Sequence, residues 1–174
     1  LIIIAIARRT LFAKLNPLLS HSLESCTELC RLKKNPYVEF VHWLDQLLQH
    51  PESHLLCILR YFSTDQAQLE ADLSRALALL PVGAENVSDF SYLVDRVIEK
   101  AWLIASLDDS PARQIRSSHL LMALLSHPDL YRALITLSPV FTSFSVDHIR
   151  RDITDILRGS TEAPMADAEA VTGH

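Results

Sequence analysis

Glycine and cysteine are both scarce in this 174-residue sequence. Three glycines leave no glycine-rich phosphate loop, and the G-x-x-x-x-G-K-[ST] motif is absent, so we expect the chain to bind no cofactor. The cysteines, Cys26, Cys30 and Cys57, are odd in number and lack the spacing of a disulfide framework. This usage is typical of a reducing compartment and therefore predicts a cytoplasmic protein.

The sequence also lacks an excess of positive charge and a long apolar run. Its net charge is −5 at pH 7, which argues against nucleic acid as a partner because phosphate binding needs a basic surface. The apolar stretch at residues 1–7 is too short to span a bilayer, and no basic segment precedes it as in a secretory signal. The first residue is not methionine, so we expect the chain to be either a fragment of a longer protein or an edited sequence.

What the sequence does contain is helical periodicity. Hydrophobic residues make up 49% of the chain, and the prolines divide them into segments with one apolar face each. Either Ser63 or Asp65 is placed to cap one of these helices. The pattern predicts an all-α fold, with helices at about 3–15, 18–33, 40–49, 54–61, 66–80, 89–107, 118–126, 129–137 and 146–157.

One ten-residue sequence motif occurs twice. HWLDQLLQHP at 42–51 and HLLMALLSHP at 119–128 share six of ten residues and lie 77 residues apart. LEADLSRAL at 69–77 matches IRRDITDIL at 149–157 at a spacing of 80. A single copy of such a unit would leave one apolar side exposed, so we expect two copies to pack against each other.

The duplication therefore predicts one domain over residues 1–159. It would hold about eight helices, from a tandem repeat of a four-helix motif with pseudo-twofold symmetry, plus an extended N-terminal helix. We place repeat one at about 11–81 and repeat two at about 88–158. The small, polar residues 160–174 read as a flexible linker or an added tail.

The doubled pattern, with H-x-L-x-x-L-L near the start of the predicted helices 40–49 and 118–126, resembles the Clp N-terminal domain. That module is the tandem repeat at the front of Hsp100 unfoldases, and the resemblance covers roughly residues 11–158. Four segments are similar to one branch, the ClpV (TssH) type of AAA+ ATPase of bacterial type VI secretion. They are KLNP at 14–17, SLESCTELC at 22–30, AWLIASL at 101–107 and IRSSHLLMALL at 115–125.

The resemblance implies binding rather than catalysis. In this family the N-domain captures an N-terminal helix of the large type VI sheath subunit, and the ATPase rings then disassemble contracted sheath. ATP and Mg²⁺ would be bound by other domains of a hexameric parent protein. We expect this domain alone to be a non-enzymatic monomer in the bacterial cytoplasm, with no nucleic-acid or membrane partner.

A groove between the starts of the first helix and of helix 89–107 is the candidate partner-binding site. The duplication places these two helices at equivalent positions, and a groove between them would accept an amphipathic helix. Packing in the core is the alternative role for these residues, above all for Leu15 and Leu93. The candidate residues are Leu11, Phe12, Leu15, Phe90 and Leu93.

A basic patch lies beside this predicted groove. Arg8, Arg9 and Lys14 would either steer an acidic peptide end toward it or form an ordinary solvated face.

The repeated histidines and the cysteines invite a catalytic or metal interpretation. We expect His42 and His119 to pack beneath their repeats and to bond loop carbonyls, because a duplicated fold duplicates its structural groups. Cys26 and Cys30 share one helix face, but a zinc site would need two more ligands, so we expect no metal and two core residues. A Cys–His nucleophile pair stays open at this stage, although no activating motif surrounds any thiol.

Two other functions therefore remain open. One is the N-domain of a general Hsp100 disaggregase or a protease-linked Clp ATPase, which would bind adaptors or unfolded apolar segments and show promiscuous peptide binding. The other is a small enzyme using Cys and His, which would show a thiol of raised reactivity at neutral pH.

Overall fold

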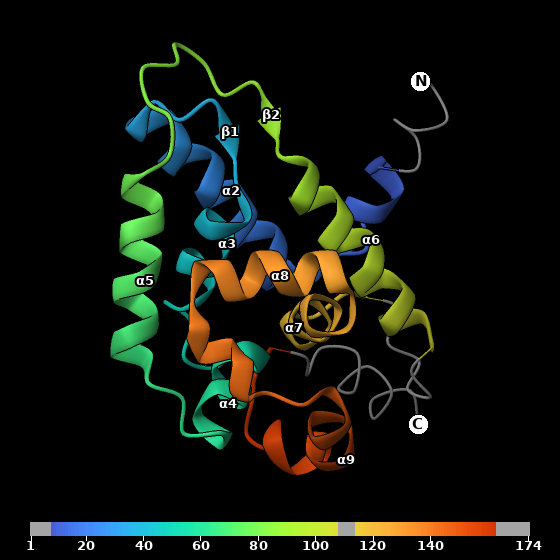
Figure 1. Ribbon diagram of the computed structural model, residues 1–174. Coiled ribbons are helices and arrows are strands. Elements are labelled where there is room, and N and C mark those ends of the chain that lie inside the picture. The colour runs from blue at the N-terminus through green and yellow to red at the C-terminus, as the bar shows by residue number, and fades with distance from the viewer. Residues whose placement is uncertain (1–7, 108–113, 163–174) are drawn as a thin grey trace.

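The computed structural model describes residues 8–107 and 114–162, and these form a mainly helical fold (Figure 1). The all-α prediction is confirmed, and each predicted range overlaps an observed helix, although the helix predicted at 89–107 begins only at Tyr92, after a short strand. The α-helices are α2 (Pro17–Lys33), α3 (Phe40–Leu47), α4 (His54–Tyr61), α5 (Gln66–Ala78), α6 (Tyr92–Leu107), α7 (Ser117–Ser126), α8 (Pro128–Leu137) and α9 (Val146–Ile156). The other labelled elements are the 3-10 helix η1 (Pro139–Ser143) and the short strands β1 (Tyr37–Val38) and β2 (Asp89–Phe90).

The first helix, predicted at 3–15, is shorter at its C-terminal end than the periodicity indicates. Residues 8–12 are helical and turn residues follow, while residues 3–7 of the prediction lie outside the described residues. The helix stops because the backbone near Leu15 pairs with a distant segment. The Asn16 N–H donates to the Ile115 carbonyl at 3.0 Å, and the Ile115 N–H donates to the Lys14 carbonyl at 2.7 Å.

Two parallel backbone pairings join the repeats. Leu15, before α2, forms a bridge with Ile115, before α7. Strand β1, before α3, pairs with β2, before α6. Each pairing therefore connects the entry to the first helix of one repeat with the entry to the second helix of the other. This exchange is what packing of two copies around a pseudo-twofold axis would produce.

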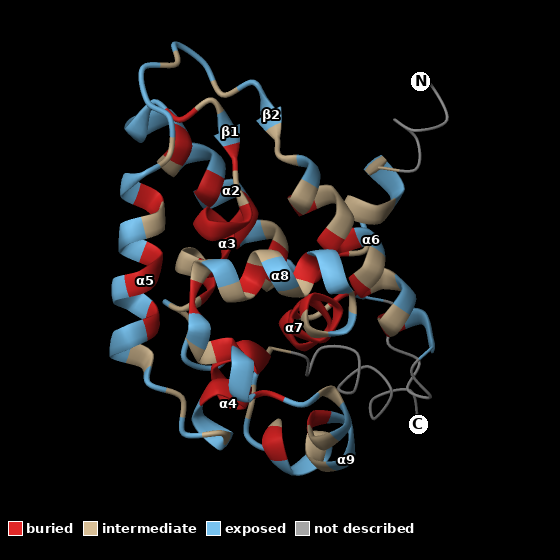
Figure 2. Ribbon diagram, viewed as in Figure 1, coloured by how far each residue is buried: buried red, intermediate tan, exposed pale blue. Residues whose placement is uncertain are grey.

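Helix α7 lies at the centre of the molecule. Figure 2 shows it buried around nearly its whole surface, and every residue from Ser117 to Leu124 is buried. Helix α8 crosses in front of it, and α6, α4 and α9 lie on other sides (Figure 1). A helix that is apolar on all sides needs such an enclosed position. None of the described helices is long and apolar enough to cross a membrane.

Polar side chains cap the first turns of α2 and α5. Asn16 precedes Pro17 and accepts a hydrogen bond from the Leu19 N–H at 2.9 Å, which caps α2. Of the two predicted caps of α5, Asp65 is the one used, accepting from the Gln68 N–H at 3.0 Å. Ser63 lies in the connecting turn with a φ of 51°.

The chain remains attached to the domain beyond the predicted boundary at residue 159. The Ser160 hydroxyl donates to the Glu52 carbonyl at 2.5 Å, and the Glu162 carboxylate contacts the helical body. The last described contacts therefore fall within the segment predicted to be a flexible tail. The rest of that prediction, residues 163–174, lies outside the described residues.

Candidate partner-binding site

Two of the predicted partner-binding residues touch directly. Phe12, at the end of the first helix, and Phe90, on β2, meet edge to face with ring centroids 5.3 Å apart and planes at 62°. Both side chains are half-buried. Such a pair contributes about 0.5–1.5 kcal/mol beyond the area it buries. The contact therefore joins the end of the first helix to the strand before α6, rather than two helix starts.

Arg8 covers this aromatic pair. Its guanidinium carbon lies 5.4 Å from the Phe12 ring centre and 5.5 Å from that of Phe90. Its nitrogens bond both carboxylate oxygens of Asp89, at 3.1 and 2.8 Å, and reach Asp95 at 2.7 Å. The hydrogen bond from Arg8 lowers the pKa of Asp89, whereas burial raises that of Asp95. We name Arg8, Phe12, Asp89 and Phe90 the aromatic patch.

The predicted basic patch is committed largely to intramolecular contacts. Arg8 is paired as described above, and the Lys14 ammonium lies 5.0 Å from the centre of the Trp102 ring. Arg9 is exposed. The first helix is therefore held to α6 and β2 by charge as well as by apolar contact, and its cations form part of that attachment.

The other three predicted residues occupy different environments. Leu11 is half-buried against the core beside Phe12. Leu15 is only 6% exposed, so the core alternative holds for it, and it can support the aromatic patch but offers a partner almost no surface. Leu93 is half-buried and faces a separate hollow.

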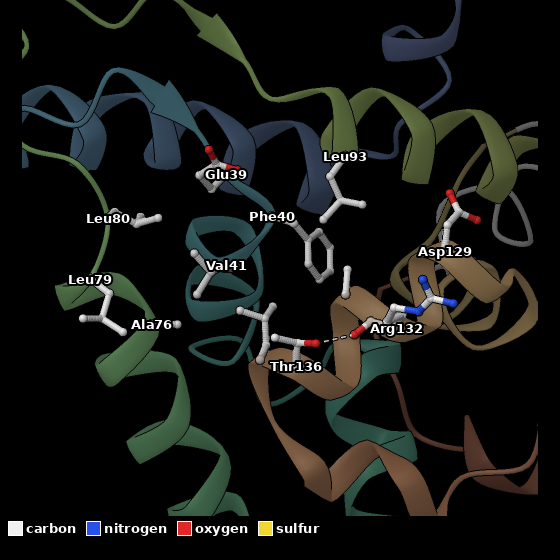
Figure 3. Close-up of a pocket in the computed structure, with 12 residues that line it drawn as sticks. Glu39, Phe40, Val41, Ala76, Leu79, Leu80, Leu93, Asp129, Arg132 and Thr136 are labelled. Atoms are coloured by element: carbon white, nitrogen blue, oxygen red, sulfur yellow. Dashed lines mark hydrogen bonds between the residues drawn. The ribbon is translucent and has the colours of Figure 1, made fainter.

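That hollow, of about 630 Å³, opens between α3, α5, α8 and the start of α6 (Figure 3). Figure 3 shows Phe40 and Leu93 pointing into it from one side and Leu79 and Leu80 lying at the other. The lining is mostly apolar, with charge at the rim. The lining residues are Glu39, Phe40, Val41, Ala76, Leu79, Leu80, Leu93, Asp129, Arg132, Ala133, Thr136 and Leu137.

One edge of the hollow is fixed by an ion pair between helices. Arg96 Nη2 on α6 donates to Asp129 Oδ1 on α8 at 3.2 Å, and Arg96 Nε bonds the other carboxylate oxygen. This pairing lowers the pKa of Asp129 to about 2. Leu79, at the opposite edge, is 80% exposed. An apolar surface with a charged rim suits apolar side chains of a peptide more than a catalytic reaction.

The repeated histidines are structural, but their hydrogen bonds differ from the prediction. The Glu39 N–H donates to Nδ1 of His42 at 2.9 Å, and the Arg116 N–H donates to Nδ1 of His119 at 3.0 Å. The predicted carbonyl partners are therefore wrong for Nδ1, which accepts an orphan N–H at the entry to its own helix. A free N–H at a helix start needs an acceptor, and the ring supplies it.

The geometry opposes a Cys–His nucleophile. Cys30 Sγ lies 3.4 Å from His42 Nε2, and both residues are fully buried. Burial raises the pKa of Cys30 to about 11 and lowers that of His42 to about 4. An activated pair needs the opposite shifts. His42 Nε2 also lies 3.0 Å from Asn35 Oδ1, to which it donates because Nδ1 is an acceptor.

The remaining thiols and acids form no metal centre in the part of the chain that the structure describes. Cys26 is fully buried, and burial raises its pKa. All three cysteines are unbridged. Within residues 8–107 and 114–162, no three His, Cys, Asp or Glu side chains gather as metal ligands would.

Sequence reasoning missed three residues that shape these surfaces. Asp89 and Asp95 hold the Arg8 guanidinium over the two aromatic rings. Both lie more than eighty residues from Arg8 in sequence, and no local pattern indicates the ion pairs. Glu162 was assigned to the tail because its neighbours are small and polar, although its carboxylate contacts two helices.

Known proteins similar to this chain share its fold and its repeat. Residues 14–131 match the family model described as the Clp repeat (R) N-terminal domain. The chain is 44% identical over 162 residues to the chaperone protein ClpB of Yersinia enterocolitica and 38% identical over 157 residues to the AAA+ ATPase ClpV1 of Pseudomonas aeruginosa. These matches take in 93% and 90% of this chain but only 18% and 17% of the two relatives.

Solved N-domains superpose closely. The N-terminal domain of the ClpV1 ATPase of an E. coli type VI secretion system is 25% identical, with a TM-score of 0.82, over 94% of this chain and 98% of that one. A ClpV N-domain in complex with a VipB peptide is 28% identical, with a TM-score of 0.73, over 89% and 94% of the two chains. With the family match and the observed double repeat, these likenesses show that the chain belongs to the Clp repeat N-terminal domain family.

Proposed function

We propose that this domain is the substrate-recognition N-domain of a ClpV-type unfoldase. It binds an N-terminal helix of the large type VI sheath subunit, so that the ATPase of the whole protein can disassemble contracted sheath. The observation that carries the proposal is the contact between Phe12 and Phe90, which joins the first helix to the start of the second repeat. The partner helix packs across Leu11, Phe12 and Phe90, with Leu15 beneath, and does not reach Leu93, which faces the separate hollow.

The relatives support the choice of partner. A domain of the same fold, 28% identical to this one, forms a complex with a VipB peptide, and the chain is also 38% identical to a ClpV ATPase. Half-buried aromatic residues can serve as anchors for the apolar face of a helix. Because Arg8 lies over the rings and is paired with Asp89, a polar residue of the partner also finds charge at the patch.

The binding needs only modest strength. Docking of one short helix plausibly gives about micromolar affinity, roughly −8 kcal/mol. In a hexameric parent, several such contacts act together on an assembled sheath and release separately. The domain itself uses no cofactor in this proposal, since ATP and Mg²⁺ belong to other domains, and it works in the bacterial cytoplasm.

Fluorescence anisotropy with a labelled sheath-subunit helix tests the proposal. We expect saturable binding by the domain and loss of binding in a Phe12→Asp, Phe90→Asp double variant that remains folded by circular dichroism. The matched control is Leu32→Asp, Leu107→Asp, which adds the same charge at exposed leucines. A scrambled peptide that binds as tightly as the native helix would contradict the proposal.

The N-domain of a general Hsp100 disaggregase is the second candidate. The 44% identity to a ClpB chaperone favours it, as does the mostly apolar hollow beside α8, which could accept unfolded segments of many sequences. In that case the scrambled peptide would bind, and an Ala133→Asp substitution in the hollow would reduce its binding more than the double variant of the aromatic patch does.

A further inference from the structure

The carboxylate of Glu162 lies in a pocket of hydrogen-bond donors at the starts of two helices. Oε1 accepts from the Ser117 N–H at 2.6 Å and from Asn16 Nδ2 at 3.1 Å. Oε2 accepts from the His54 N–H at 2.6 Å and from the Ser117 hydroxyl at 2.6 Å. Each oxygen thus has two donors, and these come from three separate elements of the fold.

The donors are buried and held in place. Asn16, His54 and Ser117 are each 1–2% exposed. The Ser117 hydroxyl also accepts from the Leu55 N–H at 2.9 Å, so the start of α7 is bonded to the start of α4 before Glu162 adds its contacts. Helix starts favour negative charge because their N–H groups point outward and their dipoles are positive there. Two such starts converge on one carboxylate here.

We propose that the starts of α4 and α7, with Asn16, form a carboxylate-binding site whose ligand is the chain's own Glu162. The site fixes where the chain leaves the domain. After α9 the segment runs back past α4 toward α7 (Figure 1), and the contact between Ser160 and Glu52 holds its middle. Docked Glu162 joins the end of repeat two to α4 of repeat one. The inference is independent of which partner the aromatic patch binds.

Amide NMR on the full 174-residue chain tests the site. In Glu162→Ala we expect the His54 and Ser117 amide signals to move and their hydrogen exchange to accelerate at least about tenfold, the factor equivalent to about 1.4 kcal/mol. The matched control Glu24→Ala removes the same charge from an exposed position on α2 and should leave both amides unchanged. Unchanged amides in Glu162→Ala would overturn the inference.

Added acetate then tests whether the emptied site takes carboxylates. At constant ionic strength, we expect acetate to move the His54 and Ser117 amide signals of Glu162→Ala back toward the wild-type positions and to leave the wild-type chain unaffected, because Glu162 already fills its site. An equal response of both chains, or no response of the variant, would overturn the assignment of a carboxylate site.

Discussion

At the scale of single residues, the buried polar groups follow local rules that sequence shows only in part. The duplication of His42 and His119 indicated structural roles, and the structure agrees. The hydrogen-bond partners of the two rings were not predictable from sequence, because they depend on which backbone group lies next to each Nδ1 at the start of its helix. The Arg8 pairings were equally hidden, since Asp89 and Asp95 reach it only through the packing of the second repeat.

His42 makes stability depend on pH. Burial lowers its pKa from the ordinary 6.5 to about 4, so between these values the unfolded chain takes up a proton that the folded chain does not. The free energy of unfolding is therefore unaffected by this ring above about pH 6.5 and decreases as the pH falls toward 4. The total decrease is about 3 kcal/mol for a pKa shift of this size. Urea unfolding at several pH values measures the slope.

In His42→Asn that slope should become shallower, because the titrating ring is gone while an acceptor remains for the Glu39 N–H. The control His21→Asn replaces an exposed histidine and should keep the wild-type slope. A His42→Asn chain with the wild-type pH dependence would contradict this assignment.

The thiols should be inert in the folded protein. Burial raises the pKa of both Cys26 and Cys30, and Cys57 is also buried. We expect a disulfide reagent at pH 7 to react with them only slowly, at a rate limited by unfolding, and to titrate all three rapidly in denaturant. One thiol that reacts at once in the native chain would revive the interpretation as a small Cys–His enzyme.

At the scale of elements, periodicity located the helices because each buries one apolar face, but it could not show how they begin and pair. The first helix ends early because Leu15 leaves it to pair with Ile115. Strands β1 and β2 have two residues each, too few to create a period, so sequence gave no signal for them. The choice between Ser63 and Asp65 likewise depended on a backbone turn with positive φ.

The cap of α5 gives a prediction at this scale. Asp65→Ala removes the acceptor of the Gln68 N–H and should lower the free energy of unfolding by about 1 kcal/mol. Ser63→Gly should instead be neutral or slightly stabilising, because glycine adopts the left-handed conformation at less cost. Chemical denaturation of the two variants compares them. Equal destabilisation by both would mean that the cap is shared.

At the scale of the whole molecule, the repeat predicted the architecture because neither copy can cover its own apolar side. The exchanged pairings and the central α7 make the two repeats one core rather than two units. The predicted groove was harder to place. Phe12 and Phe90 meet, but not as counterparts in the duplication, because α6 corresponds to α2 and Phe12 lies before α2. Leu93 faces the hollow on another side, and Leu15 is buried.

One core implies one unfolding transition. Leu120 on α7 is 2% exposed, and Leu120→Ala should cost about 2–5 kcal/mol. Amides of α2 and α3 in repeat one should lose as much protection from hydrogen exchange as those of α8 in repeat two. Leu103→Ala, at a position 48% exposed, should have little effect. Loss of protection confined to repeat two would show that the repeats unfold separately.

The central claim is that a sheath-subunit helix docks on the aromatic patch, and amide chemical-shift mapping with that peptide tests it most directly. We predict that the signals of Leu11, Phe12 and Phe90 move most, saturate together, and remain unmoved by a scrambled peptide. Shifts centred instead on Ala133 and Thr136 at the hollow, or shifts that the scrambled peptide reproduces, would contradict the claim.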